Sequence, residues 1–186
     1  MRVISGSAKG IRLSSVPGKS TRPITDRVKE ALFNILGSTV VGTSILDLFG
    51  GTGAVGIEAL SRGASHAHFL DTNFRAFRTI QENLKTTRLE ASATILKRDA
   101  FVYLHEEDER QFDLIYIAPP QYKDLWIKAM QILDDNPGLL NLDGIVIVQI
   151  HPKEYKETVV FRNFQPYDER NYGDTRLIFY DRVSMQ

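Results

Sequence analysis

Short apolar runs alternate with longer amphipathic stretches along most of this 186-residue chain. Apolar residues dominate 45–49, 67–70, 93–96, 112–117 and 144–150, which predicts five buried strands. Helices are predicted between them at 54–62, 73–86, 101–105 and 123–133. Such alternation is typical of an α/β fold whose mostly parallel sheet is covered on both faces. Two further strands, near 158–161 and 176–180, are expected to complete a seven-stranded sheet.

The beginning of the chain has a different pattern. Val3-Ile4 and Ile11-Arg12-Leu13 predict a small β-hairpin, and a capped helix with one apolar face is predicted at 26–36. We therefore expect an N-terminal arm at 1–24 and the main α/β domain at 25–186.

Charge is distributed unevenly, although the net charge of the whole chain is zero. Residues 1–30 hold seven Lys and Arg side chains against two acidic ones, a local net charge of +5. Such a basic arm indicates a polyanionic partner, and a solvated leader is the alternative. The candidate contacts are Arg2, Lys9, Arg12, Lys19, Arg22 and Arg27.

Composition excludes several classes of site. Cysteine is absent, so there are no disulfides, thiolate zinc sites or cysteine nucleophiles, and the four histidines show no metal-binding pattern. No apolar run approaches the roughly 20 residues of a membrane span, and the first residues lack the apolar core of a signal peptide. We expect a cytoplasmic protein without a metal, with a monomer favoured.

The stretch 44–59 contains the strongest chemical signal. An apolar strand runs into Gly50-Gly51-Thr52-Gly53, and Gly56 follows at the start of a helix. Residues 51–56 match the G-x-G-x-x-G nucleotide fingerprint in its strand–turn–helix setting. Asp71 lies twenty residues after Gly51, where a ribose-binding carboxylate is expected.

Asp47 helps to identify the nucleotide. Its carboxylate lies just before the turn, where it would repel the pyrophosphate of a dinucleotide and attract a cationic amine. S-adenosylmethionine (SAM) carries such an amine and no phosphate. SAM is therefore favoured over a dinucleotide or a purely structural glycine turn.

Ligands of open α/β sheets bind at the carboxyl ends of the strands. After the strand at 93–96, Asp99 is placed to accept a hydrogen bond from an adenine amino group and Ala100 to donate its backbone N–H; Asp99 could instead cap the next helix. The complete set of candidate SAM contacts is Asp47, Phe49, Gly50, Gly51, Gly53, Asp71, Asp99 and Ala100.

The strand at 112–117 ends in a second motif, Ala118-Pro119-Pro120-Gln121-Tyr122. The prolines fix the backbone and leave carbonyl acceptors, and the tyrosine offers a ring on which a base can stack. This segment resembles the [Asn/Asp]-Pro-Pro-[Tyr/Phe] motif of methyltransferases that act on exocyclic amines. It departs from that motif because Ala118 replaces the acidic or amide residue and Gln121 precedes the aromatic one.

Taken together, the chain resembles the RsmD-type 16S rRNA (guanine(966)-N2)-methyltransferase family. The matching stretches extend over nearly the whole chain and lie at 1–6, 21–36, 46–56, 58–64 and 172–175. The resemblance implies a Rossmann-like SAM-dependent methyltransferase fold whose last hairpin strand is antiparallel. It also implies methyl transfer to a guanine in ribosomal RNA, free or in an assembling small subunit.

Ala118 lacks the side-chain acceptor that the family motif has at this position, so other groups would have to recognise the amine. The backbone carbonyls of Ala118 and Pro119, with the Gln121 side chain, could accept from the amine and stabilise its developing positive charge. Two alternatives stay open: a methyltransferase of similar fold acting on a DNA base or protein amide, and a non-catalytic SAM- or RNA-binding module.

Overall fold

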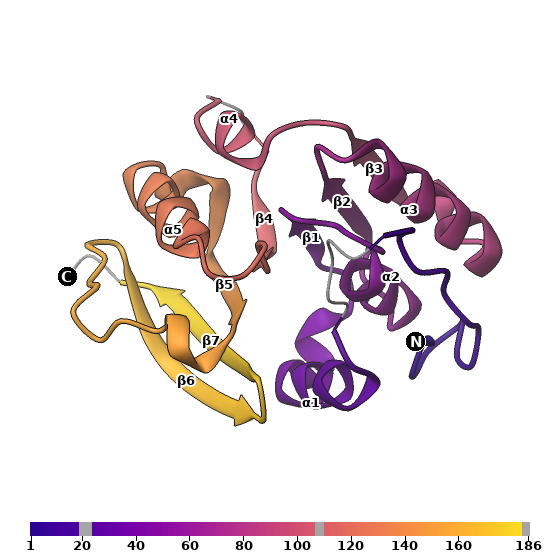
Figure 1. Cartoon of the computed structure of the whole chain (residues 1–186), viewed down its shortest axis with the longest axis horizontal. Coiled ribbons are helices and arrows are strands. Elements are labelled where there is room, and N and C mark those ends of the chain that lie inside the picture. Colours follow the sequence, from indigo (N-terminus) through magenta and orange to yellow (C-terminus); the bar gives the residue numbers. More distant parts are fainter. Residues whose placement is uncertain (19–23, 107–109, 184–186) are drawn as a thin grey trace. The chain divides into compact units, whose positions relative to one another are not determined.

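A computed structural model describes residues 1–18, 24–106 and 110–183. The chain divides between Asp99 and Ala100 into two units, each with its own set of paired strands (Figure 1). Among the described residues, no helix is long and apolar enough to cross a membrane.

The first unit, residues 1–99, contains three parallel strands in the order β3-β2-β1. Helix α2 packs against β1 and β2, and α3 packs against β3 (Figure 1). The predicted alternation of strand and helix is thus present in this unit. The elements are α1 (Asp26–Leu36), η1 (Gly37–Val40), β1 (Ser44–Asp47), α2 (Ala54–Ser61), β2 (His66–Leu70), α3 (Phe74–Thr87), η2 (Glu90–Ser92) and β3 (Ala93–Leu96).

The N-terminal arm is anchored to α2 by a buried charged side chain. Glu58 accepts hydrogen bonds from the backbone N–H groups of Ile4 and Ser5 at 2.8 and 3.0 Å. Its carboxylate also lies 3.2 Å from the ammonium of Lys29, and both side chains are fully buried. Desolvation lowers the pKa of Lys29, while the charge of Glu58 opposes that shift.

The predicted hairpin is present as a short pairing rather than as two regular strands. The Val3 N–H donates to Ile11 at 2.9 Å and the Leu13 N–H to Met1 at 3.2 Å, around an antiparallel bridge between Arg2 and Arg12. The N–H groups of the turn that follows Val3 bond instead to Glu58 and Ser61 of α2, which limits the length of the pairing. The arm therefore belongs to the first compact unit, and its separate role as an RNA-binding extension at 1–24 stays a prediction.

The second unit, residues 100–186, contains four strands in the order β4-β5-β7-β6. Strands β4 and β5 are parallel, whereas β7 is antiparallel to both β5 and β6. The elements are α4 (Ala100–Leu104), β4 (Phe112–Ile117), α5 (Leu125–Asp135), η3 (Pro137–Leu139), β5 (Leu140–Ile150), η4 (Pro152–Glu154), β6 (Phe164–Tyr172) and β7 (Thr175–Arg182).

One predicted strand was wrong. The strand expected near 158–161 lies instead at Phe164–Tyr172, a mostly polar and solvent-exposed stretch. It pairs only with β7 among the described strands, and its register shifts between Pro166 and Asp168. Edge strands tolerate polar residues, proline and bulges, so the apolar pattern misplaced this one. The predicted fold class is otherwise confirmed, including the antiparallel last strand.

Candidate functional site

The glycine turn after β1 has backbone angles that favour glycine. Gly51 and Gly53 lie in the left-handed region, with φ of 54° and 75°. The Gly50 N–H donates to the carbonyl of Leu70 at 2.7 Å, and the Gly53 N–H donates to Gly50 at 2.7 Å. The first bond ties the turn to the end of β2 and the second closes the turn on itself. Side chains at the two left-handed positions would be strained.

Close packing also limits the residues at the ends of the turn. A Cβ added at Gly50 would lie 2.8 Å from Ile80 of α3, and one added at Gly56 would lie 2.3 Å from the ring of Phe69. Helix α2 can approach β2 only because position 56 has no side chain. The fingerprint therefore has a structural role at Gly56 and leaves Gly51 and Gly53 to form the backbone cradle.

Asp71 braces the turn from the carboxyl end of β2. Its Oδ2 accepts from the Gly51 N–H at 2.9 Å, and its Oδ1 accepts from the Asn73 N–H at 2.8 Å. Asn73 in turn caps α3 by accepting from the Arg75 N–H at 2.8 Å. A carboxylate has about four acceptor sites, so each Asp71 oxygen can still accept from a hydroxyl.

Asp47 is buried beneath the turn, with 1% of the residue exposed. Burial raises the pKa of its carboxyl to about 7, and the nearby charge of Asp71 adds to that rise. Hydrogen bonds from the backbone N–H groups of Phe49 and Gly56 oppose it. Among the described residues, Asp47 Oδ1 has no hydrogen-bond partner.

Such an orphaned buried acceptor is expensive unless a ligand pairs with it. A cationic amine fits Asp47, and a backbone cradle braced by Asp71 fits a ribose. These features suit SAM. The remaining candidates bracket the unit boundary: Asp99 is exposed at the end of the first unit, and Ala100 is buried at the start of α4.

In the second unit, the segment Ala118–Tyr122 leaves the end of β4 without regular secondary structure. Tyr122 is 66% exposed and has a left-handed φ of 62°. That conformation costs an L-residue roughly 1–2 kcal/mol. The Tyr122 N–H donates to Glu154 Oε1 at 2.7 Å, and a hydrogen bond to a charged group contributes about 1.5–3 kcal/mol, enough to hold it.

Sequence reasoning missed Glu154 and His151. The ring centroids of Tyr122 and His151 lie 5.5 Å apart, with a tilt of 43°. Glu154 lies in η4, just after β5, and is 7% exposed. The sequence does carry one signal: His151-Pro152-Lys153-Glu154 fits a capping box, in which an acidic residue reaches back to the N-cap.

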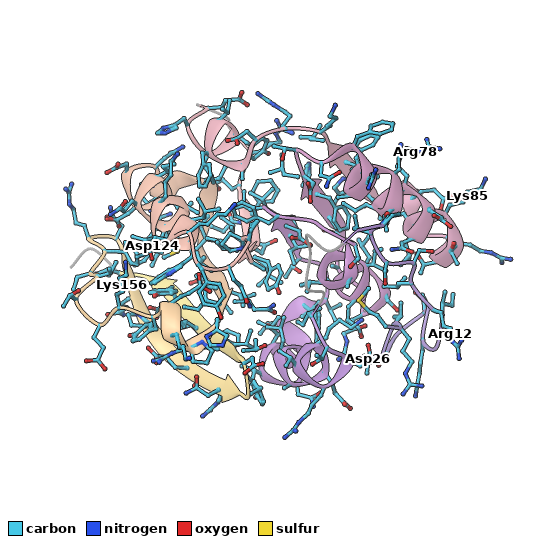
Figure 2. All side chains as sticks on the ribbon, in the orientation of Figure 1. Arg12, Asp26, Arg78, Lys85, Asp124 and Lys156 are labelled. Atoms are coloured by element: carbon cyan, nitrogen blue, oxygen red, sulfur yellow. The ribbon has the colours of Figure 1, made fainter. Side chains whose placement is uncertain are left out.

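Several cations of the first unit lie on its surface, whereas Lys29 is buried. Arg2 lies 3.7 Å from Asp26, while Lys9, Arg12 and Arg27 are exposed. Lys19 and Arg22 lie outside the described residues. Arg78 and Lys85 of α3, which the sequence analysis did not consider, also project outward (Figure 2). In the described part of the chain, no cluster of three or more His, Asp or Glu residues could hold a metal ion.

Comparisons with known proteins agree with this geometry. The family model described as "Conserved hypothetical protein 95" matches residues 1–181. The chain is 41% identical over 184 residues to "Putative rRNA methyltransferase YlbH" of Bacillus subtilis, covering 98% of this chain and 99% of the relative. It is 29% identical to "Ribosomal RNA small subunit methyltransferase D" of Escherichia coli, covering 98% and 90%.

Solved structures show the same fold. A structure titled "Putative methyltransferase yhhF from Escherichia coli" matches with a TM-score of 0.84 and 30% identity, covering 100% of this chain and 99% of that one. A more distant solved structure, described as "a putative methyltransferase complexed with SAH", matches with a TM-score of 0.64 and 18% identity. It covers 84% of this chain and 48% of that one.

Proposed function

Because the chain belongs to the family described as conserved hypothetical protein 95, the RsmD-type methyltransferases, we propose that it methylates the N2 amine of a guanine in small-subunit ribosomal RNA. SAM is the methyl donor. The observation that carries the proposal is the buried Asp47, whose Oδ1 is unpaired beneath a glycine turn braced by Asp71.

The first unit supplies the donor side of the reaction, together with Ala100, the residue that follows it in the chain. Asp47 pairs with the amine of the donor, and the Gly50–Gly53 backbone admits it closely. Asp71 accepts from the ribose hydroxyls, while Asp99 and the Ala100 N–H contact the adenine. When bound, SAM supplies an electrophilic methyl group on a sulfonium.

The second unit supplies the acceptor side. The exposed Tyr122 ring stacks on the target base, which must leave any stack it occupies. Carbonyls of Ala118 and Pro119, with the Gln121 amide oxygen, accept from the N2 hydrogens and localise the nitrogen lone pair. Pro120 keeps the segment rigid. Ala118 supplies no side-chain acceptor, and we propose that these groups replace it.

Atoms and charge balance in the transfer. The N2 lone pair forms the new N–C bond as the methyl–sulfur bond breaks, and the sulfur keeps the bonding electrons as a neutral thioether. One N2 proton then leaves, which removes the positive charge from the nitrogen. No strong base is required because the methylated, ammonium-like nitrogen is acidic.

Ribosomal RNA is favoured as the acceptor by charge as well as by family. The exposed Lys9, Arg12 and Arg27 of the first unit can contact phosphates, and such contacts are salt-dependent. Replacing Arg12, Lys19 and Arg22 with Ala should flatten the dependence of RNA affinity on salt by about two to three phosphate contacts. SAM affinity should not change. If the logarithm of RNA affinity falls with the logarithm of salt concentration equally steeply in both proteins, the arm does not contact phosphates.

The proposal is tested by transfer of labelled methyl from SAM to small ribosomal particles that lack this modification. Free 16S RNA and double-stranded DNA serve as comparison substrates. We expect N2-methylguanosine in the digested RNA and no label in DNA. Label in DNA or protein, or none anywhere, would contradict the proposed substrate. A cytoplasmic site of action is part of the same proposal.

A further inference from the structure

Three acidic residues are buried in the described part of the chain, and Glu154 is the one in the second unit. Its two oxygens hold two separate backbone groups. Oε1 accepts from the Tyr122 N–H at 2.7 Å, and Oε2 accepts from the His151 N–H at 3.1 Å. One carboxylate thus joins the segment after β4 to the turn after β5.

The same carboxylate places two aromatic rings. Tyr122 and His151 have ring centroids 5.5 Å apart, and each has its backbone N–H bound to Glu154. The His151 ring is fixed a second time, because its Nδ1 accepts from the Lys153 N–H at 3.1 Å. A neutral His151 therefore carries its proton on Nε2. The left-handed φ of Tyr122 aims its side chain in a direction that an unrestrained tyrosine rarely adopts.

We propose that Glu154 is a positioning residue for the acceptor base. It holds Tyr122 and His151 as a two-ring platform, against which the flipped guanine is seated. This inference rests on the proposed function, because it assigns the platform to the base that is methylated. It also explains how a flexible aromatic side chain can present a base reproducibly, which alignment of the reacting atoms requires.

A second, exposed tether provides a matched control. Lys156 Nζ lies 2.6 Å from Oδ2 of Asp124, the residue before α5. Figure 2 shows the two side chains together. Asp124 also has a left-handed φ, of 52°. Both side chains of this pair are about half exposed, and exposed ion pairs contribute little. Loss of Lys156 should therefore leave the platform in place.

The test compares Glu154→Gln with Lys156→Met. Glutamine has one acceptor oxygen where glutamate has two, so at least one of the two N–H groups loses its partner. In Glu154→Gln, hydrogen exchange of the Tyr122 or His151 amide should accelerate at least tenfold, relative to the core amide of Ile147. The turnover number on ribosomal RNA should fall at least tenfold, with SAM affinity within twofold of wild type. Lys156→Met should change neither readout by more than twofold.

Each contrary result has a distinct meaning. Unchanged exchange at both amides would show that Glu154 does not hold them. Faster exchange with wild-type turnover would show that the two rings do not seat the base. A wild-type protein inactive on every ribosomal RNA substrate would overturn the proposed function and this role of Glu154 together, whereas the first two results leave the proposed function intact.

Discussion

The glycine turn of the first unit and the proline segment of the second reach defined shapes in opposite ways. Gly51 and Gly53 adopt left-handed angles that suit their residue type. Tyr122 adopts a left-handed angle that does not suit its type, and a carboxylate 32 positions away holds its N–H. One region is shaped by its own residues and the other by a distant partner.

The difference also separates two kinds of chemistry. Beneath the glycine turn, the buried Asp47 is left with an unpaired acceptor, so binding energy is available to a cationic ligand. In the proline segment, Tyr122 is exposed, and what the fold maintains there is the left-handed backbone conformation of that residue. We therefore expect changes in the first region to affect cofactor affinity or stability, and changes in the second to affect the rate.

The largest expected effect is on stability. Glu58→Gln leaves Lys29 buried without its carboxylate partner, and breaking a buried ion pair costs about 3–5 kcal/mol of unfolding free energy. Denaturant titration measures this loss of unfolding free energy. Adding Lys29→Met should recover part of the loss, since it removes the unpaired buried ammonium. Arg62, whose Nε lies 2.8 Å from Glu58 Oε1 in the wild type, still lacks its carboxylate partner in the double variant. The exposed pair in the second unit is the control, and Lys156→Met should cost less than about 1 kcal/mol. Equal losses would contradict the account of the arm's anchor.

Next in size is the loss of cofactor affinity in Asp71→Ala. The substitution removes the acceptor of the Gly51 N–H and the proposed acceptor for two ribose hydroxyls. We expect SAM binding to weaken by roughly 1.5–3 kcal/mol, measured by calorimetry. Tyr122→Ala should bind SAM as the wild type does. Unchanged SAM affinity in Asp71→Ala would show that Asp71 does not bind the ribose.

A smaller effect concerns pH. The pKa of Asp47 is raised to about 7, and a cationic amine favours its charged form. SAM binding should therefore release a proton below pH 7, and affinity should fall as pH falls, by up to about tenfold per unit. Asp47→Asn should bind more weakly and show a flat profile from pH 5 to 7. In Asp71→Ala, the pH below which SAM affinity begins to fall should be lower, since the Asp71 charge contributes to the raised pKa of Asp47. A flat wild-type profile would contradict the pairing.

The Asp47 carboxyl also makes the stability of the folded protein depend on pH. Its folded pKa lies above the ordinary value of 3.8, so the folded state binds more protons between about pH 4 and 7. The Asp47 contribution to stability is therefore present at low pH and is lost as pH rises through 7.

What the sequence could predict follows the same division between local and distant causes. The helix at 26–36 and the strands at 93–96 and 112–117 have the predicted bounds, because caps and apolar runs are local signals. The edge strand β6 was misplaced because its residues are mostly polar and exposed. Gly50, Gly51, Gly53 and Asp71 are linked by hydrogen bonds within the first unit, and Asp47 lies close enough to Asp71 for its charge to raise the pKa of Asp47.

Glu154 could not be found in the same way. Its partner Tyr122 lies in the irregular segment after β4, and the pairing requires the ends of β4 and β5 to lie side by side. The capping-box pattern at His151 indicates a turn and gives no sign that the carboxylate also reaches Tyr122. A bond between distant segments depends on tertiary packing, which a local pattern does not record.

The most direct test of the division between the two regions is the single-turnover rate of methyl transfer to ribosomal RNA as SAM concentration rises. Asp71→Ala should reach the wild-type rate once SAM is raised roughly 10- to 100-fold, because its defect is in affinity. Tyr122→Ala should stay at least tenfold slower at every SAM concentration, because base stacking is worth about 1–3 kcal/mol and cofactor binding cannot replace it. A Tyr122→Ala protein restored by SAM, or an Asp71→Ala protein that SAM cannot restore, would contradict the account.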